Sequence, residues 1–574
     1  MRLSRVMFLL ALVSVAASAN AQITRNVPSQ FATIQAAIVA SANGDTVLVA
    51  PGTYNGAIDF LGRAITVQSS GGPGVTSIVG TPAGRVVTFA TNEGLGSVLQ
   101  GFRITGGAGG ILCSKASPRI IDCIAIGMTV TTAVTSQGGA GLLIVADGAG
   151  TAASPLVDNS RFENNLVVGG SGGGVLVRTS NNATSAPQFT GCMFLNNQVI
   201  GGAGSGGGMR FDRDSGTING VLTDCRIIGN TAVNAGGVDS NHATSLSMIR
   251  CRLESNTAYS AGGNGQGQGG AIGMSGTVAT VVNCAFIGNS ATFGGAGVIS
   301  VNPGQTAAFR NCTITGNVSN GNGGIFASGS GALTIDSSVL WDNSPPQLAT
   351  NLSPSVSVSY SNVQGPVIGG NGTNISLDPR FVDPARGDFH LGTTSPCVNS
   401  GNPGAIGLPA TDIDGGARQV GVVDMGADEQ PLAGLPGTAE DLDLYALANG
   451  AGDPLATTIN TPAGTHLYMQ LRSPGGTFIG AEPLIAGQVF LTGFPPAGLV
   501  AYPAVHIDNT AFLIYSAPGV GTFMAPGLDP AGVSLNFIIP PGLTGATLRA
   551  QGLALTAIAA NGLFAVTDAR DLVF

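Results

Sequence analysis

The middle of this 574-residue chain repeats one short unit, and that repeat constrains the fold more than any other feature. Each copy begins with Cys or Ser, has a large apolar residue two positions later and an Asn three positions after that, and usually continues to a Gly-Gly pair. Successive copies start 26 to 33 residues apart, at Ser160, Cys192, Cys225, Cys251, Cys284, Cys312 and Ser338. Such a period is typical of solenoids, in which each unit buries its inner face against its neighbours.

The pattern within each copy predicts short β-strands. Val282, Cys284 and Phe286 alternate along the chain and would share one face of a strand. Asn289 then marks a bend, and the glycines after it permit a sharp corner before a second strand at 298–301. Two or three such strands per turn describe one coil of a β-solenoid, so we expect an all-β fold.

Two columns of identical residues follow from this stacking, because equivalent positions in neighbouring coils lie about 4.8 Å apart. One column is an Asn ladder in which each side-chain amide donates to the next: Asn165, Asn197, Asn230, Asn256, Asn289, Asn317 and Asn343. The other is an inward-facing stack of small apolar side chains: Cys123, Cys192, Cys225, Cys251, Cys284 and Cys312. We expect mostly free, buried thiols. Axial disulfides or a Cys113–Cys123 pair remain the alternative, because exported proteins commonly form disulfides.

Short motifs inside the repeat resemble a known family. The segments 162–165, 194–197 and 286–289 are similar to FxxN repeats, and 269–272 and 294–297 are similar to GGA[IV] repeats. Together they resemble polymorphic outer-membrane-protein repeats and the broader pectin-lyase-like superfamily, over roughly residues 30–430. The resemblance implies a right-handed parallel β-helix. It does not specify a chemistry, because that superfamily includes lyases, hydrolases, adhesins and inert spacers.

The N-terminus predicts export. Arg2 and Arg5 precede an apolar run at 6–17, and Ala19-Asn20-Ala21 resembles a signal-peptidase site, so residues 1–21 are expected to be a signal peptide. A short N-terminal membrane anchor is the alternative. No later stretch reaches the length of a membrane span without Gly or Pro, so we expect no integral span after signal removal. The expected location is secreted, extracellular or at the cell surface.

Residues 22–55 are expected to cap the first coil. Ile34 and Ile38 fall on one helical face, Ser29 is the expected N-cap, and Asn43-Gly44 the expected helix end. This segment resembles the start of many pectin-lyase-like β-helices. A covering helix also protects the open strand edge of the first coil.

The remaining chain divides into four parts. We expect parallel β-helix repeats at 56–377, an end region at 378–429, a linker at 430–441 and an antiparallel β-sandwich at 442–574. The end region, with the runs 378–383, 387–391 and 424–429, resembles the choice-of-anchor Q domain of bacterial surface β-helix proteins. Asp428 stands where that family commonly has an aromatic residue.

One group of charged residues is the candidate catalytic site. A polysaccharide lyase of this fold needs carboxylates for Ca²⁺ and an Arg or Lys base on one outer face. Arg178, Asp212 and Asn241 fall at the same step after the glycines in three consecutive coils, with Asp239 and His242 nearby. The candidate residues are therefore Arg178, Asp212, Asp239 and His242. The alternative is a solvated row of ion pairs of little energetic weight.

A second group offers oxygen ligands for Ca²⁺, the only cofactor considered: Asp412, Asp414, Asp424 and Glu429. Its spacing does not match an EF-hand loop. The alternative is a hydrogen-bonded cap that closes the last coil, and His390 is expected to be structural.

These features favour a non-catalytic role: an elongated scaffold or adhesin-like protein that binds surface polysaccharide or protein. Trp341, Tyr259 and Tyr360 are the only Trp or Tyr residues between 60 and 380, so few aromatic rings could stack on sugars. A lyase or glycoside hydrolase acting through the candidate residues, and a purely structural cell-envelope component, are the alternatives. Nucleic-acid binding is not expected, because the net charge is −9 and Lys115 is the only lysine.

Overall fold

The computed structural model describes residues 22–131, 138–262, 267–293, 297–301, 304–320, 323–392, 394–419 and 422–430, and the backbone of the strands between 443 and 573. Within these residues the protein is nearly all β, with one α-helix and one short 3₁₀ helix. None of the helices in these parts has the length and apolar character needed to cross a membrane.

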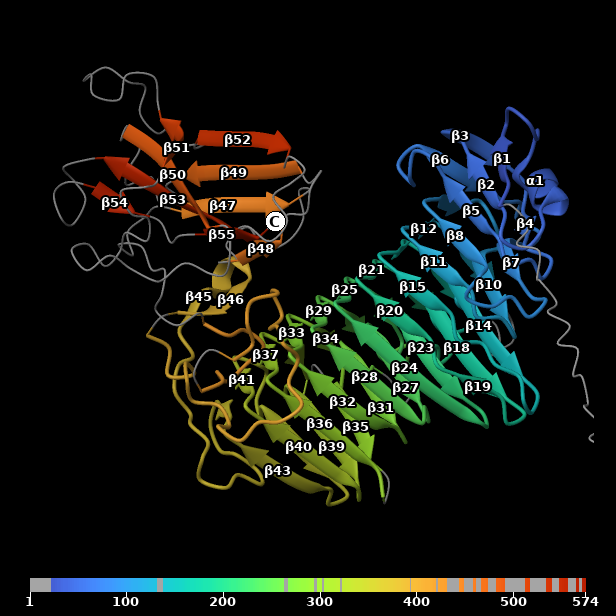
Figure 1. Cartoon of the computed structure of the whole chain (residues 1–574). Coiled ribbons are helices and arrows are strands. Elements are labelled where there is room, and N and C mark those ends of the chain that lie inside the picture. Colours follow the sequence, from blue (N-terminus) through green and yellow to red (C-terminus); the bar gives the residue numbers. More distant parts are fainter. Residues whose placement is uncertain are drawn as a thin grey trace, which may run out of the picture.

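Four long parallel sheets form the body of the molecule, a right-handed parallel β-helix (Figure 1). We name each sheet by its first strand. The β1 sheet runs from β1 (Thr24–Val27) to β43 (Ser355–Ser359), and the β3 sheet from β3 (Gly52–Asn55) to β44 (Asn362–Val363). The β4 sheet runs from β4 (Ile58–Asp59) to β42 (Leu348–Asn351), and the β13 sheet from β13 (Thr129–Thr131) to β38 (Val318–Ser319).

A middle coil contributes one strand to each sheet. The coil that starts at β15 (Leu156–Asp158) continues through β16 (Arg161–Glu163), β17 (Leu166–Val168) and β18 (Val175–Ser180). Two or three strands were expected. The additional strand is β17, which lies between the Asn corner and the glycines and pairs with β22 (Gln198–Ile200) of the next coil.

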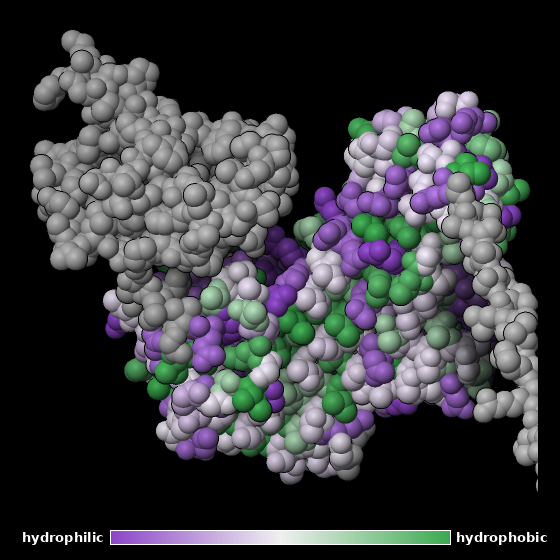
Figure 2. Space-filling view, in the orientation of Figure 1, coloured by the Kyte–Doolittle hydropathy of each residue, from purple (hydrophilic) through white to green (hydrophobic). Residues whose placement is uncertain are grey.

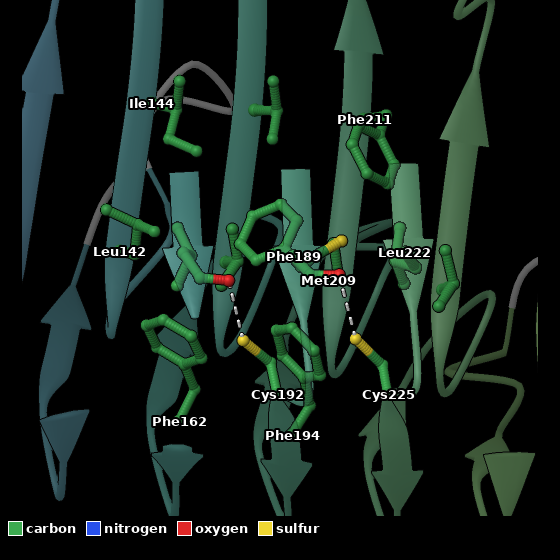
Figure 3. Packing of buried hydrophobic residues seen from close by; sticks show 14 of the residues in the cluster. Leu142, Ile144, Phe162, Phe189, Cys192, Phe194, Met209, Phe211, Leu222 and Cys225 are labelled. Atoms are coloured by element: carbon green, nitrogen blue, oxygen red, sulfur yellow. Dashed lines mark hydrogen bonds between the residues drawn. The ribbon is translucent and has the colours of Figure 1, made fainter. Parts of the chain in front are cut away.

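Alternating side chains from all coils fill one continuous core. The rings of Phe162 and Phe194 stack in adjacent coils, with centroids 5.4 Å apart and planes at 15° (Figure 3). The Cys192 thiol donates to the Val157 carbonyl of the preceding coil (3.3 Å), and the Cys225 thiol donates to the Phe189 carbonyl (3.4 Å). The inward-facing Cys column is therefore confirmed.

All eight cysteines are buried free thiols. The alternatives of axial disulfides and of a Cys113–Cys123 pair are thus wrong. Cys113 lies on β10 (Gly109–Ser114) of the β4 sheet, whereas Cys123 lies at the corner between two other sheets and donates to the Ile121 carbonyl (3.3 Å). Burial raises the pKa of Cys123 to about 12, so this thiol stays protonated at neutral pH.

The Asn ladder is also confirmed. Asn197 Nδ2 donates to Asn230 Oδ1 (2.9 Å) and to the Phe162 carbonyl (2.8 Å), and the same contacts recur at each step from Asn165 to Asn317. Each Oδ1 also accepts from the backbone N–H of the preceding Asn, as Asn230 Oδ1 does from Asn197 N (2.9 Å). The ladder therefore satisfies the polar groups of a fully buried corner.

A short helix covers the N-terminal coil, as expected, but its caps differ from the prediction. Helix α1 (Ile34–Ala40) has Thr33 as N-cap, whose side chain accepts from Ala36 N (3.1 Å), and it ends at Ser41. Ser29 does not cap it, because residues 28–30 form a turn in which Gln30 N donates to the Asn26 carbonyl (2.9 Å).

The end region folds back along the side of the β-helix. β45 (Phe381–Asp383) and β46 (Asp388–Leu391) form an antiparallel hairpin around the 3₁₀ helix η1 (Pro384–Arg386). We call residues 394–419 and 422–430 the terminal segment. It docks on three successive corners, where Asn283 Nδ2 donates to the Thr411 carbonyl (3.0 Å), Asn311 Nδ2 to the Asp424 carbonyl (3.0 Å), and Gly426 N to the Ser337 carbonyl (2.8 Å). The segment thus covers a flank of the last coils.

The C-terminal strands form two mainly antiparallel sheets, as expected for 442–574. β47 (Asp443–Ala448), β49 (His466–Arg472) and β52 (Val533–Ile538) form one sheet. The other is centred on β53 (Thr547–Leu555), which pairs antiparallel with β50 (Glu482–Phe490).

Candidate functional site

The three residues expected at one step of the β-helix are neighbours in the β4 sheet. Arg178 on β18 pairs in register with Asp212 on β23 (Met209–Arg213), and Asp212 pairs with Asn241 on β27 (Val238–Asn241). The glycine corners before these strands are in register too, so counting from the glycines gave the correct alignment.

Arg210, which was not among the four candidate catalytic residues, is the centre of this charged group. Its Nη2 lies 2.9 Å from Asp212 Oδ1, and its Nη1 lies 3.0 Å from Asp239 Oδ2. Asn241 Nδ2 also donates to Asp212 Oδ1 (2.9 Å). The three charged side chains are only 15% to 19% exposed. We call Arg210, Asp212, Asp239 and Asn241 the Arg210 network.

Arg178 and His242 lie outside the Arg210 network. Arg178 pairs at 3.5 Å with Asp214, whose side chain is 65% exposed. His242 is exposed at a corner with a left-handed backbone (φ 57°), and its carbonyl accepts from Arg213 Nε. Of the four candidate catalytic residues, only Asp212 and Asp239 therefore share an ion-pair partner, which is Arg210.

The two carboxyl groups of the Arg210 network have different pKa values. Burial raises the pKa of Asp239 to about 6, against the opposing effect of Arg210 and with a further increase from Asp212. Burial also raises the pKa of Asp212, but Arg210, Asn241 and Arg178 outweigh it, so the net shift is downward. At neutral pH both groups are ionised, and the Arg210 guanidinium lies between them.

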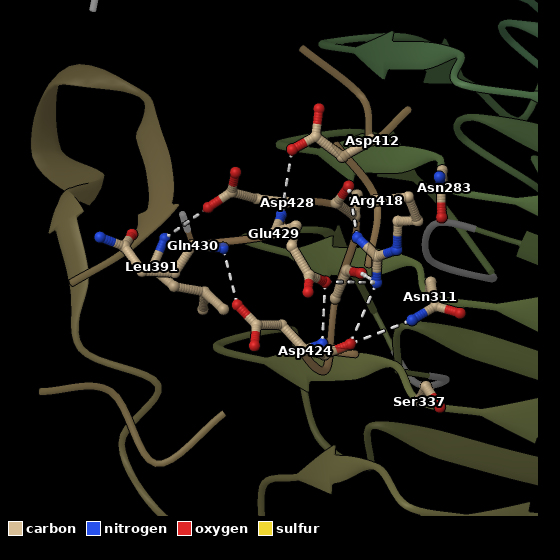
Figure 4. Close-up of polar contacts among 12 residues, drawn as sticks. Asn283, Asn311, Ser337, Leu391, Asp412, Arg418, Asp424, Asp428, Glu429 and Gln430 are labelled. Carbon is tan, nitrogen blue, oxygen red and sulfur yellow. Dashed lines mark hydrogen bonds and ion pairs between the residues drawn. The ribbon is translucent and has the colours of Figure 1, made fainter. Parts of the chain in front are cut away.

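Three of the four candidate Ca²⁺ ligands, Asp412, Asp424 and Glu429, belong to a buried network in the terminal segment (Figure 4). Asp412 Oδ1 accepts from Asp414 N (3.0 Å) and Gly416 N (2.8 Å), and Asp424 accepts from Asn399 N and Gln430 N. Glu429 Oε2 accepts from Asp424 N (2.9 Å). These oxygens satisfy backbone amides and do not surround one point.

Arg418 organises the centre of this network. Its side chain is 1% exposed and donates to the carbonyls of Asp424 (3.0 Å), Gly426 (2.9 Å) and Ala427 (3.1 Å). Its Nη2 lies 3.9 Å from Glu429 Oε2. Asp414 instead faces His390, whose Nε2 lies 2.9 Å from Asp414 Oδ2.

A pocket of about 250 Å³ opens between the outer face of the β1 sheet and the terminal segment. Its lining includes Arg310, Thr334, Asp336, Ser359, Asn402 and Ile406. Asp336 accepts from Ser359 Oγ (2.6 Å) and Asn402 Nδ2 (3.3 Å). Arg310 and Asp336 are register partners, yet no acidic side chain of the described residues forms an ion pair with Arg310.

Comparison with known proteins adds no family. No protein-family model matches the chain. No curated protein sequence matches it either. The parallel stack and its core therefore establish the architecture, and the function has to be inferred from the geometry above.

Proposed function

We propose that this protein is an exported, non-catalytic scaffold or adhesin-like protein that binds an acidic surface polysaccharide. In this proposal it is a pectin-lyase-like β-helix with repeats of the polymorphic outer-membrane-protein type and a choice-of-anchor Q-like end region. The main support is that the strongest catalytic candidate is a closed ion-pair network: Arg210 is bound to both carboxylates, so it is not free to act as a base.

The pocket supports a binding role. Arg310 offers a guanidinium without a carboxylate partner among the described residues, and Thr334, Ser359 and Asn402 place hydroxyl and amide groups beside it. A guanidinium recognises a carboxylate through paired hydrogen bonds, and the neighbouring polar groups suit sugar hydroxyls. An acidic sugar residue within a polymer is the ligand class that matches this lining.

The outer face of the β1 sheet can extend such an interaction. Gln188, Val221 and Ser247 are register partners on this face, and each is at least partly exposed. Figure 2 shows apolar and polar side chains interspersed on the visible surface of the β-helix, without one broad hydrophilic stripe. A mixed, flat surface can pack against the C–H groups of sugars while it hydrogen-bonds their hydroxyls.

The test is binding of residues 22–574 to immobilised polygalacturonate and alginate, with neutral glucan as the reference. We expect binding to an acidic polymer that salt weakens, and at least a tenfold loss in Arg310→Ala. Arg103→Ala is the control, because Arg103 is exposed on β9 (Arg103–Thr105), away from the pocket. Binding that is absent, or that both variants reduce equally, would contradict the proposal.

A glycoside hydrolase or lyase is the second candidate. The observation that favours it is the separation of the Asp212 and Asp239 pKa values, a pattern that acid–base pairs in enzymes share. The absence of a free base in the Arg210 network weighs against it.

A further inference from the structure

Three side chains with metal-binding atoms converge beside the β45–β46 hairpin. His390 comes from β46, Asp414 from the turn after Asp412, and Asp428 from the end of the terminal segment. One ligand atom from each lies within 4.8 Å of the other two, and no other group of three or more His, Cys, Asp or Glu residues in the described parts of the chain meets this limit. Small side-chain rotations bring such atoms to the roughly 2 Å that a bound divalent ion requires.

A second group holds the side chains of His390 and Asp428, and another holds the backbone of Asp414. His390 Nδ1 lies 2.5 Å from Asp388 Oδ1, which leaves Nε2 as the ring nitrogen that faces Asp414. Leu391 N donates to Asp428 Oδ2 (3.0 Å), as Figure 4 shows, and Asp414 N donates to Asp412 Oδ1 (3.0 Å). A carboxylate behind the remote nitrogen of a ligating histidine is the usual arrangement in metal sites, because it fixes the tautomer and the ring orientation.

The negative charge of the carboxylates around this site also favours a bound cation. Asp428 is only 9% exposed, and its Oδ2 accepts from Leu391 N (3.0 Å). Asp388, Asp412 and Asp414 add three more carboxylates nearby, whereas Arg418 is occupied by backbone carbonyls and Glu429. Carboxylates gathered at a largely buried place repel one another, and a bound cation reduces that repulsion.

We propose that His390, Asp414 and Asp428 form a binding site for one divalent transition-metal ion, with Zn²⁺ or Mn²⁺ as the expected class. One imidazole with two carboxylates favours these ions over Ca²⁺, which takes six to eight oxygen ligands. The site differs from the all-oxygen set expected from the sequence, because it includes His390 and Asp428 and shares only Asp414 with that set. The ion would fasten the β45–β46 hairpin to the terminal segment, and this role does not depend on the polysaccharide proposal.

The test uses residues 22–574, freed of metal with a chelator and titrated separately with Zn²⁺, Mn²⁺ and Ca²⁺ by calorimetry. We expect one tight site for Zn²⁺ or Mn²⁺, weaker binding of Ca²⁺, and a rise in Tm that follows the added metal. His390→Ala and Asp428→Asn should weaken binding at least 100-fold. Asp388→Asn should weaken it about 10- to 100-fold, because it removes only the orienting group. His242→Ala is the matched control and should bind as the unaltered protein does.

A second measurement uses only the unaltered protein, because a variant that fails to fold would lose metal binding for that reason alone. Co²⁺ bound to the unaltered protein should show visible absorption of an ion in a low-coordinate site with a nitrogen ligand. Three results would overturn the proposal: no uptake of Zn²⁺, Mn²⁺ or Co²⁺; uptake that His390→Ala leaves unchanged in a folded protein; or a Co²⁺ spectrum of an ion in an all-oxygen octahedral environment.

Discussion

At the scale of single residues, the asparagine ladder shows how a buried corner can be built from polar side chains. Asn230 is fully buried, and its side chain makes four hydrogen bonds: the amide donates to Asn256 Oδ1 (3.0 Å) and the Phe194 carbonyl (2.8 Å), and Oδ1 accepts from two groups of Asn197. Each Asn of the ladder both donates and accepts hydrogen bonds. Loss of one member therefore leaves partners unsatisfied in the coils on both sides.

We predict that Asn230→Ala lowers the free energy of unfolding by about 3 kcal/mol or more, because each buried group left without a partner costs roughly 1–3 kcal/mol. Urea denaturation followed by circular dichroism measures this. The control is Asn219→Ala on the exposed face of β24 (Thr217–Thr223), where the side chain only accepts from Ser245 Oγ (2.8 Å); we expect a change below about 0.5 kcal/mol. Equal effects of the two substitutions would refute the energetic role of the ladder.

The Arg210 network predicts a pH dependence. Burial raises the pKa of Asp239 to about 6, against about 3.9 in an unfolded chain. The folded protein therefore holds this proton more tightly, and the stabilisation is complete below about pH 4 and lost as the pH rises through 6. Asp239 faces Arg210 and Asp212.

We expect the contribution of Asp239 to fall by roughly 2–3 kcal/mol between pH 4 and pH 7. Asp239→Asn, which keeps an oxygen for Arg210, should flatten the profile of unfolding free energy over this range. Asp214→Asn, at a side chain that is 65% exposed, should not. An unchanged profile in Asp239→Asn would show that this carboxyl does not titrate as described.

At the scale of elements, the terminal segment depends on the corners of the β-helix. Asn283, Asn311 and Ser337 have left-handed backbones (φ 51°, 49° and 50°) and each precedes a residue of the Cys/Ser column. This conformation turns a side chain or carbonyl outward at each coil, where the segment binds. Asn tolerates such a φ better than most residues, so its presence at two of these corners has a conformational reason.

We predict that Arg418→Met detaches the terminal segment without unfolding the middle coils. The substitution removes the guanidinium that binds three backbone carbonyls and pairs with Glu429, and breaking a buried ion pair typically costs about 3–5 kcal/mol. Limited proteolysis with mass spectrometry should find new cleavages between 394 and 430. Arg386→Met, whose side chain is 78% exposed, should leave the cleavage pattern unchanged. New sites across the middle coils would contradict the separation of these elements.

Features that recur with the sequence repeat could be predicted, and contacts between segments outside the repeat could not. The Asn ladder, the Cys column and the alignment of Arg178 with Asp212 recur with the repeat, so one copy predicts the others. Arg210 and Asp239 lie two positions before Asp212 and Asn241, so the same alignment also predicts their pairing, which was missed. The convergence of His390, Asp414 and Asp428 could not be predicted, because the fold joins three non-repetitive segments. Thr33 was missed as N-cap because the turn at 28–30 delays the start of the helix.

At the scale of the whole molecule, the chain is a long parallel stack whose most regular residues face inward. Its clusters of charged and polar groups lie outside the core: at the Arg210 network on the repeat strands β23 and β27, at the pocket lined by Arg310, and at the docking site of the terminal segment. Two of these three places involve the terminal segment, which is not part of the repeat. The repeat thus supplies a rigid body and the strands that carry the Arg210 network, and the terminal segment adds groups that the repeat lacks.

The central claim, binding without cleavage, is tested most directly by size-exclusion chromatography with light scattering on the protein mixed with an acidic polysaccharide that it retains. We predict that protein and polymer elute together and that the polymer keeps its molar mass after prolonged incubation. Shortened polymer with unsaturated or new reducing ends, lost in Asp212→Ala, would contradict the account and show that the Arg210 network is catalytic.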